Sequence, residues 1–474
     1  MKHYYFLGIG GIGMSALARF FHLRGDHVEG YDRTPSPLTE ELEAEGIPVH
    51  YDDAPDRLPQ QIDLAIYTPA VPDDLCEMQA LRARGVCMEK RSQVLGELTT
   101  GKRCIAVAGS HGKTTTSTLI AHLLCSSGKG CSAFLGGISK NFDSNLHVDP
   151  ESDFVVVEAD EYDRSFLQLH PYMAVITATD PDHLDVYGTH ENMLEAYAQF
   201  AHQVDPEGRL FLKEGIFIRE GGEPFLEYGP HHHDHEHHHD HEHHELEHAH
   251  LMTYTAHGIE ADYYAINVRT YNGNLFFDLR TPDGVFYDIE LCGTALYNVE
   301  NAVAAAAVAL QCGLDQYQLR SGLKTFAGVR RRFDYRIREK ELVYIDDYAH
   351  HPAELKATID SVRYLYPGKR LVGVFQPHLY TRTRDLADQF AEVLQELDEI
   401  VLMPIYPARE KPILGVTSSM VLRKMASMNK YLCTPDQVLE LVPALCPDVV
   451  LTLGAGDIDR LVPRLEQTLK EQVL

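Results

Sequence analysis

The chain has 474 residues, which is enough for two to four domains of ordinary size. Its 42 basic and 70 acidic residues give a net charge of −28, which argues against binding nucleic acid or anionic membranes through the overall field. Nine scattered cysteines include no CxxC pair, so neither a zinc ribbon nor a CxxC redox motif is visible and a reducing compartment is indicated. No signal peptide and no stretch of about 18 apolar residues is present, so we expect a cytoplasmic protein without membrane insertion.

Residues 1–99 alternate short apolar runs with helical patterns, which predicts a Rossmann-like domain with a parallel sheet. Its first strand runs into "GIGGIG", where Gly8, Gly10 and Gly13 have the GxGxxG spacing and Asp32 follows nineteen residues after Gly13. This pattern indicates a loop for a diphosphate. A dinucleotide and a nucleotide-sugar both supply one, and a glycine turn that only allows close packing is the alternative.

Residues 100–325 are predicted to form a second, P-loop ATPase-type α/β domain. The strand "RCIAVA" leads into "AGSHGKTTT" and then into a helix, although Val107 stands where the first glycine of the usual phosphate loop belongs. The backbone N–H groups from Gly109 to Lys113 can still wrap a phosphate at a helix N-terminus. We expect Lys113 to reach the β and γ phosphates and the Thr114 hydroxyl to bind Mg²⁺.

Acidic side chains follow two further predicted strands of this domain, in "VEADEYD" and "DPDHLD". They predict a Mg²⁺ site opposite the phosphate loop, or else ordinary helix capping and solvated loops. These residues are Glu158, Asp160, Glu161, Asp163, Asp182, His183 and Asp185. Asn298 and Asn301 begin an alanine-rich helix, where their amides either satisfy free N–H groups or bind a purine edge.

A histidine-rich tract interrupts the domain at residues 230–250. It has no apolar periodicity, so it is predicted to be a disordered insertion. Imidazoles beside carboxylates attract Zn, Ni or Cu, so the tract is either a metal site or a low-complexity loop that binds metals incidentally.

Residues 326–474 are predicted to form a third, Rossmann-like domain. Basic and histidine side chains follow its strands in "GVRRRFD", "YIDDYAHHPAE" and "FQPHLYTRTRD". Arginines at the carboxyl end of a strand suit carboxylates and phosphates, whereas the paired acids and histidines could form a satisfied network. The candidates are Arg330, Arg331, Arg332, Asp346, Asp347, Tyr348, His350, His351, His378, Arg382 and Arg384.

Taken together, these motifs resemble the Mur ligase family, the ATP-dependent amino-acid-adding enzymes of bacterial peptidoglycan synthesis. The segments "GIGGIGMS", "GSHGKTTT", "EADEYDRSF", "DPDHLD", "YNVENAVAA", "RRFD", "DDYAHHPAE", "QPHLYTRTRD" and "GAGDI" occur in the family's order. The loop with the shifted glycine is similar to that family's own form, G-[ST]-[HN]-G-K-T. The resemblance implies a three-domain α/β protein.

Within the family, the motifs are most similar to those of the alanine-adding ligases. The resemblance implies that L-alanine is joined to the carboxylate of UDP-N-acetylmuramate through an acyl phosphate, with ATP and Mg²⁺. It places Gly8, Gly10, Gly11, Gly13, Met14, Ser15 and Asp32 at the UDP-sugar; Gly109, Ser110, His111, Gly112, Lys113, Thr114, Thr115, Asn298, Asn301, Arg332 and Asp347 at ATP; His350, His378 and Arg382 at the amino acid; and Thr114, Glu158 and His183 at the metal. Lys113, His183, Arg332 and His350 are the implied catalytic residues.

Other functions remain open from the sequence. A murein tripeptide ligase of the same family would differ in the amine site, and Leu379 departs from the arginine that many relatives carry there. A histidine-rich metallochaperone GTPase would explain the tract but not the N-terminal loop. An NAD oxidoreductase would leave Lys113 without a role. The sequence does not predict an oligomeric state.

Overall fold

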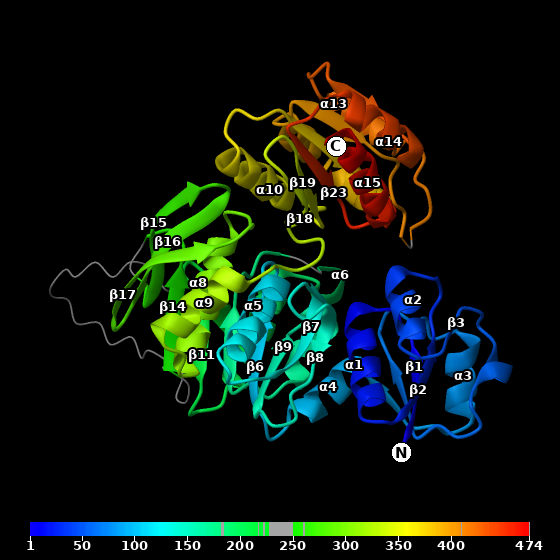
Figure 1. The fold of residues 1–474 in the computed structure, drawn as a ribbon. Helices are drawn as coiled ribbons and strands as arrows, with labels where there is room; N and C mark the ends of the chain where they lie inside the picture. The colour runs from blue at the N-terminus through cyan, green and yellow to red at the C-terminus, as the bar shows by residue number, and fades with distance from the viewer. Residues whose placement is uncertain are drawn as a thin grey trace. The chain divides into compact units, whose positions relative to one another are not determined.

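The computed structural model describes residues 1–181, 184–216, 218–220, 223–226, 250–258, 261–408 and 410–473. The chain divides into two compact units, which are described separately (Figure 1). Unit 1 comprises Met1–Val268, Phe277–Glu290 and Glu300–Phe326, and unit 2 comprises Arg269–Phe276, Leu291–Val299 and Ala327–Leu474. The chain therefore passes five times between the units, at 268/269, 276/277, 290/291, 299/300 and 326/327. No helix of the described part is long and apolar enough to cross a bilayer.

Unit 1 begins with a five-stranded parallel sheet in the order β3-β2-β1-β4-β5. Its central strand, β1 (His3–Leu7), is buried on both faces, as is usual for parallel sheets between helices. The other elements are β2 (His27–Tyr31), β3 (Val49–His50), β4 (Leu64–Tyr67), β5 (Met88–Lys90), α1 (Ile12–Leu23), α2 (Pro37–Ala44), α3 (Cys76–Ala83) and α4 (Arg91–Thr99).

Unit 1 also contains a ten-stranded sheet in the order β17-β16-β15-β14-β11-β10-β6-β9-β7-β8. The strand β6 (Arg103–Ala108) lies between parallel β9 (Phe154–Glu158) and β10 (Met173–Ile176), and α5 (Lys113–Ser126) follows β6 after a short loop. The remaining strands are β7 (Ser132–Ser139), β8 (Ser144–His147), β11 (Arg209–Lys213), β14 (His250–Thr255), β15 (Tyr263–Tyr271), β16 (Asn274–Thr281) and β17 (Gly284–Leu291), with β12 (Ile218–Glu220) and β13 (Glu223–Leu226) as a separate pair. The helices are α6 (Leu184–Tyr187), α7 (His190–His202), α8 (Asn298–Gln311) and α9 (Gln316–Thr325).

The two sheets of unit 1 share one apolar core, in which α1 packs against β7 and β8. Arg19 of α1 is buried there, forms a forked pair with Glu45, and donates to Asn145 Oδ1 at 2.5 Å. Asn145 Nδ2 in turn donates to Ile12 O at 2.6 Å and lies 2.9 Å from Ser15 Oγ. The N-terminal layer is therefore fixed to the central layer by both packing and buried hydrogen bonds.

Unit 2 is built on a six-stranded sheet in the order β18-β19-β23-β20-β21-β22, with β18 antiparallel and the others parallel. Four consecutive strands, β19, β23, β20 and β21, are buried throughout. The strands are β18 (Asp334–Arg338), β19 (Val343–Asp347), β20 (Leu371–Phe375), β21 (Glu399–Leu402), β22 (Lys430–Leu432) and β23 (Val449–Leu453); the helices are α10 (Pro352–Leu365), α11 (Tyr380–Asp385), α12 (Ala387–Leu394), α13 (Ser418–Lys424), α14 (Pro435–Ala444) and α15 (Val462–Val473).

The predicted α/β class is confirmed, with helices and mainly parallel strands alternating along the chain. The domain boundaries after residues 99 and 325 stay predictions. Most of the histidine tract, residues 230–249, lies outside the described residues, and His250 is the first residue of β14.

Candidate active site

The loop between β6 and α5 has the backbone geometry of a phosphate-binding loop. Gly109 has φ +132°, and a Cβ there would lie 2.2 Å from Thr177 Oγ1, so only glycine fits. Thr177 Oγ1 is within hydrogen-bonding distance of the carbonyl oxygens of Ala108 and His111, and Ser110 N donates to Ala178 O at 3.0 Å. The loop after β10 therefore holds the phosphate loop in shape.

Lys113, the first residue of α5, forms a partly buried ion pair in this loop. Its Nζ lies 2.8 Å from Glu161 Oε1 and 2.6 Å from Gly109 O. Burial alone would lower the pKa of Lys113, but the Glu161 and Glu158 carboxylates outweigh it and raise the pKa above its usual value. Lys113 is thus a permanent cation at the point where a phosphate would meet the loop.

Glu158, the last residue of β9, presents an unsatisfied acceptor. A Cβ at Gly136 of β7 would lie 2.1 Å from Glu158 Oε2, so the carboxylate rests against the bare glycine backbone. Among the described residues Glu158 Oε2 is buried and has no hydrogen-bond partner. A buried carboxylate oxygen in need of a positive partner fits a divalent cation.

The other predicted metal ligands are only partly described. Thr114 is buried in the first turn of α5, next to Lys113. His183 lies outside the described residues, and the described part of the chain contains no group of three or more His, Cys, Asp or Glu side chains placed for a metal. The metal set of Thr114, Glu158 and His183 stays a prediction.

The two asparagines of α8 have different surroundings. Asn301 Oδ1 accepts from Thr116 Oγ1 at 3.2 Å, and a Cβ at Gly112 would lie 2.6 Å from it, so Asn301 contacts the phosphate loop and α5 directly. Asn298 Nδ2 donates to Thr294 Oγ1 at 2.6 Å. Thr115, the residue directly before Thr116 in α5, is buried.

In the N-terminal loop, Asp32 holds the glycine turn. Asp32 Oδ2 accepts from Gly10 N at 2.8 Å, and Gly11 precedes the first residue of α1. Met14 and Ser15 are buried on α1, and Ser15 belongs to the Asn145 network. Gly8 and Gly13 complete the turn, so the predicted UDP-sugar residues form one continuous loop and helix start, in which Asp32 has a backbone partner that the sequence did not reveal.

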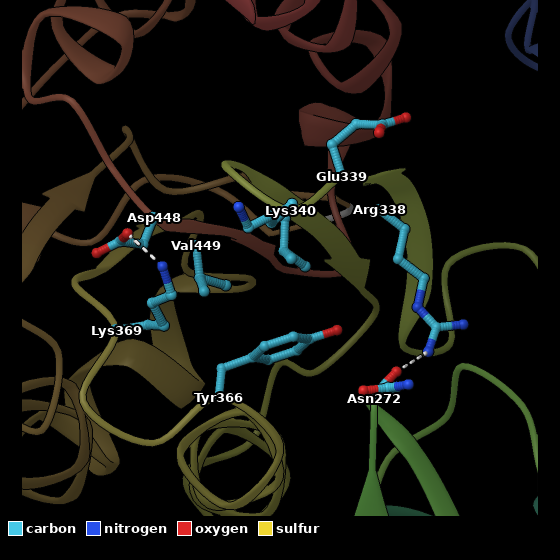
Figure 2. Close-up of a pocket in the computed structure, with 9 residues that line it drawn as sticks. Asn272, Arg338, Glu339, Lys340, Tyr366, Lys369, Asp448 and Val449 are labelled. Carbon is cyan, nitrogen blue, oxygen red and sulfur yellow. Dashed lines mark hydrogen bonds and ion pairs between the residues drawn. The ribbon is translucent and has the colours of Figure 1, made fainter.

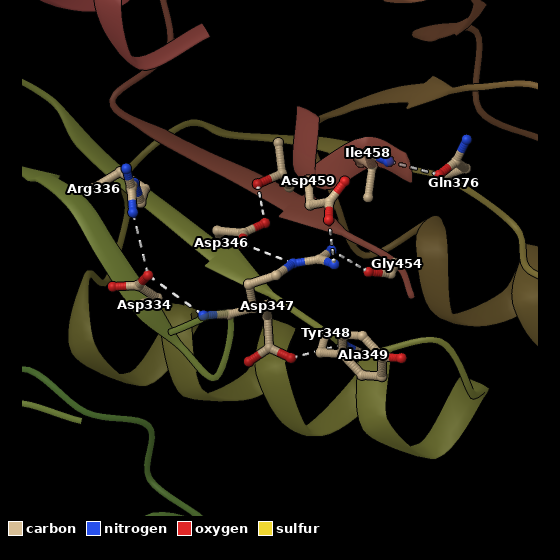
Figure 3. A network of polar contacts seen from close by, with 12 residues as sticks. Asp334, Arg336, Asp346, Asp347, Tyr348, Ala349, Gln376, Gly454, Ile458 and Asp459 are labelled. Atoms are coloured by element: carbon tan, nitrogen blue, oxygen red, sulfur yellow. Dashed lines mark hydrogen bonds and ion pairs between the residues drawn. The ribbon is translucent and has the colours of Figure 1, made fainter. Parts of the chain in front are cut away.

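In unit 2 the predicted residues lie near the carboxyl ends of β19 and β20, and Figure 3 shows Asp346, Asp347 and Tyr348 at the end of β19. Asp347 is buried there and accepts from Phe333 N and Ala349 N, both at 2.8 Å, and from Tyr297 OH at 3.2 Å. Burial raises the pKa of Asp347 to about 6, although Arg332 and the two backbone donors oppose the shift.

Two neighbouring arginines at this edge have different roles. Arg331 is bound to the sheet: its Nη2 donates to Gly454 O at 2.6 Å and its Nε to Asp346 Oδ2 at 3.3 Å. Arg332 makes no ion pair with any described residue, and its Cζ lies 4.9 Å from the centre of the Tyr348 ring. Arg332 is therefore the arginine of this pair that is available to a ligand.

His350, His378 and Arg382 lie close together in unit 2. The rings of His350 and His378 are 6.0 Å apart, and His378 stacks on Tyr406 at 5.7 Å. Burial lowers the pKa of His350, and burial together with His350 and Arg382 lowers the pKa of His378 to about 4. Both imidazoles are neutral near pH 7, and His378 Nδ1 is buried without a hydrogen-bond partner in the described part of the protein.

Leu379, directly after His378, has φ +71° and ψ 137°, a strained conformation for a residue with a side chain. Its backbone N–H donates to Tyr406 O at 2.9 Å. Glu410 accepts from Thr381 N at 3.0 Å and also from the Thr381 hydroxyl, and these bonds outweigh burial and lower the pKa of Glu410. This loop is held rigidly beside the histidines.

A cavity of about 360 Å³ lies at the opposite, amino ends of β19 and β23 (Figure 2). Arg338, Tyr366 and Lys369 line it together with Asn272 from the tip between β15 and β16. None of the predicted site residues lines this cavity, so it is separate from the candidate site.

Sequence reasoning missed three contributors to these sites. Glu161 was noted only as one of several acids, yet it is the ion-pair partner of Lys113. Thr177 ends the apolar run "MAVIT" and fixes the loop. Asn145 lies in a region without a motif, and no sequence signal pointed to it.

Three family models match the chain: "Mur ligase family, catalytic domain" over residues 3–103, "Mur ligase middle domain" over 107–309, and "Mur ligase, glutamate ligase domain" over 331–456. Curated relatives named UDP-N-acetylmuramate--L-alanine ligase include those of Parabacteroides distasonis (47% identical; 99% of this chain and 97% of the relative) and Porphyromonas gingivalis W83 (47%; 99% and 99%). The crystal structure of UDP-N-acetylmuramate-alanine ligase MurC from Thermotoga maritima is 25% identical, with a TM-score of 0.82 over 100% of both chains. A murein peptide ligase from Psychrobacter arcticus shares the fold, with 19% identity and a TM-score of 0.67 over 99% of both chains. The family resemblance and the three-domain α/β class predicted from the sequence are thus confirmed, and the chain belongs to the Mur ligase family of ATP-dependent ligases.

Proposed function

We propose that the protein joins L-alanine to the carboxylate of UDP-N-acetylmuramate, with ATP converted to ADP and phosphate, in peptidoglycan synthesis. The observation that carries this proposal is the 47% identity over 99% of the chain to relatives that bear this activity as their name. The phosphate loop supports it, because Lys113 is a partly buried cation at a helix N-terminus.

In this proposal, Lys113 holds the β and γ phosphates and stabilises the negative charge that develops as the muramate carboxylate takes the γ-phosphate. Its pairing with Glu161 keeps the ammonium charged and oriented before the nucleotide arrives. A phosphate oxygen would take the place of the Glu161 carboxylate. The loop backbone from Gly109 to Thr115 would supply further donors.

Mg²⁺ would bind Glu158 and Thr114, with His183 as a third ligand from the family resemblance, and would neutralise phosphate charge. The buried Glu158 Oε2 supports this assignment because it has no hydrogen-bond partner among the described residues.

Unit 2 would hold the amino acid. Arg382 offers a cation for the alanine carboxylate, and the neutral imidazoles of His350 and His378 can accept a proton from the ammonium group. The nucleophile that attacks the acyl phosphate is the neutral amine. Because the pKa values of the two imidazoles are low, they serve this step only as positioning groups or transient proton carriers. Arg332 and Asp347 would serve ATP, and Gly8 to Ser15 with Asp32 the UDP-sugar.

The test is ADP formation and product mass with purified protein, ATP, Mg²⁺ and UDP-N-acetylmuramate, comparing L-alanine, glycine, L-serine, a stem tripeptide and no amine. We expect turnover with L-alanine, a product larger by one alanine residue, and loss of both in Lys113→Ala. Turnover with the tripeptide alone would instead assign the protein to murein recycling, and turnover without the sugar nucleotide would rule out the ligase.

A further inference from the structure

Two cysteines and a histidine form a cluster near the end of α5 opposite to Lys113, and they have no role in the proposed reaction. The Cys125 and Cys131 sulfur atoms are 3.7 Å apart, and Cys131 Sγ also lies 3.7 Å from Ala121 O. Cys125 is partly exposed in the last turn of α5, whereas Cys131 is fully buried just before β7.

His147 completes the cluster from β8. The β7–β8 register places His147 opposite Ala133, two residues after Cys131. Its ring stacks on Phe142 at 4.6 Å, which fixes the imidazole in place. The His147 side chain also lowers the pKa of Cys125, a thiol with partial access to solvent.

The electrostatic surroundings give the two thiols different pKa values. The hydrogen bond from Cys131, followed by the influence of the His147 side chain, lowers the pKa of Cys125 to about 5 against the effect of burial. The hydrogen bond to Cys125 and burial raise the pKa of Cys131, and Cys125 raises the pKa of His147. Cys125 is therefore the thiolate, and Cys131 keeps its proton beside it.

We propose that Cys125 is a modification site that reacts with hydroperoxides, and that Cys131 resolves the product into a Cys125–Cys131 disulfide. Two observations carry this: the short sulfur–sulfur distance and the partial exposure of one thiol only. Each sulfur needs to move by less than one ångström to reach the bonding distance of about 2.0 Å.

The chemistry balances with one hydroperoxide. The Cys125 thiolate attacks the terminal oxygen, the O–O bond breaks, and the alcohol (or water, from hydrogen peroxide) leaves with one proton, so that the sulfur is oxidised to a sulfenic acid and the peroxide is reduced. Cys131 then attacks that sulfur, the S–S bond forms, the S–O bond breaks, and water leaves with the Cys131 proton. Two thiols and one hydroperoxide give one disulfide, one alcohol and one water.

Exposed cysteines of the same chain provide internal controls. Cys76 is exposed, but its hydrogen bond to Asp53 raises its pKa, and Cys87 and Cys446 are exposed as well. If exposure alone governed reactivity, these three would react first. At pH 6 an ordinary thiol of pKa about 8.5 is roughly 0.3% thiolate, whereas Cys125 is mostly thiolate. A thiolate of lower pKa is also a weaker nucleophile, which offsets part of this difference. We therefore expect Cys125 to react about tenfold faster than an ordinary thiol.

The experiment treats the full-length protein at pH 6 with limiting hydrogen peroxide, with dimedone present to trap sulfenic acid, and quantifies each cysteine by peptide mass spectrometry. In the wild type we expect a Cys125–Cys131 cross-link, lighter by about 2 Da and reversed by dithiothreitol. In Cys131→Ser we expect the dimedone adduct at Cys125 instead, formed about tenfold faster than at Cys76 or Cys446. His147→Gln should slow this adduct, and Cys446→Ser should leave it unchanged.

Faster modification of Cys76 and Cys446 than of Cys125 would overturn the proposal. So would a wild-type protein in which Cys125 is trapped by dimedone without any cross-link to Cys131. Because the wild-type measurement needs no substitution, poor folding of a variant does not prevent either decision.

Discussion

Lys113 Nζ and Glu161 Oε1 form a 2.8 Å ion pair in the phosphate loop, with the glutamate fully buried. The pair stabilises a charged lysine whose desolvation would otherwise be unfavourable. It also blocks the lysine from a phosphate until the pair opens, so stability and nucleotide binding should respond in opposite directions to its removal.

Glu161→Gln should therefore lower the stability of the protein but increase the stabilisation that a bound nucleotide gives. We expect a loss of about 2 kcal/mol, because the lysine keeps a hydrogen-bond acceptor but loses its counter-charge. A non-hydrolysable ATP analogue should raise the melting temperature by more in Glu161→Gln than in the wild type, measured by calorimetry. The exposed Glu151→Gln is the control, and an equal or smaller shift in Glu161→Gln would contradict the role given to the pair.

Glu158→Gln should weaken Mg²⁺ binding without preventing folding. The neutral amide removes the negative charge from the unpartnered oxygen, so the Mg²⁺ concentration for half-maximal ADP formation should rise about tenfold or more. Gly136→Ala gives a second route to the same effect, because its Cβ would displace the carboxylate while leaving Glu158 in the sequence. Unchanged Mg²⁺ dependence in both variants would remove Glu158 from the metal site.

Asp347 should make stability decrease with rising pH. Its pKa of about 6 in the folded protein is above that of an unfolded aspartate, so the folded state binds the proton more tightly. That contribution is complete below pH 4 and is lost as the pH rises through 6, an effect of about 3 kcal/mol. Asp347→Asn should remove this slope from melting temperatures recorded between pH 4.5 and 7, and a slope that persists would assign it to other groups.

His378 should affect the amino acid rather than ATP. Its pKa of about 4 keeps the ring neutral, so its own titration should leave the KM for alanine constant between pH 6 and 8. His378→Ala should lower kcat/KM for alanine by about ten- to a hundredfold and leave the KM for ATP unchanged. Steady-state kinetics with each substrate varied in turn separates these outcomes, and an effect confined to ATP would refute the assignment.

Asn145→Ala should destabilise unit 1 by about 2 to 3 kcal/mol, because Arg19 and the Ile12 carbonyl both lose a buried partner. Ser15→Ala, which removes only the weaker contact, should cost less. Urea denaturation compares the two. If Ser15→Ala raises the KM for UDP-N-acetylmuramate without a stability change, then Ser15 acts on the substrate rather than on the Asn145 network.

The sequence predicted the layered α/β fold because glycine turns and apolar strands are local signals. It predicted Lys113 as the lysine of the phosphate loop for the same reason, because the loop motif is continuous in the chain. It could not identify Glu161 as the partner of Lys113, because a choice among four nearby acids depends on where the loop after β9 turns. Arg331 and Arg332 likewise look equivalent in "RRR", and only the fold shows that Arg331 is bound to Gly454 and Asp346.

The five passages of the chain between the two units limit how the protein can be recombined with its relatives. A chimera with a single junction at 326/327 would take most of unit 2 from one parent but the segments 269–276 and 291–299 from the other. Arg338 would then face a foreign Asn274, and Asp347 a foreign Tyr297. Exchange of the whole of unit 2 between family members therefore requires transplanting three separate segments together.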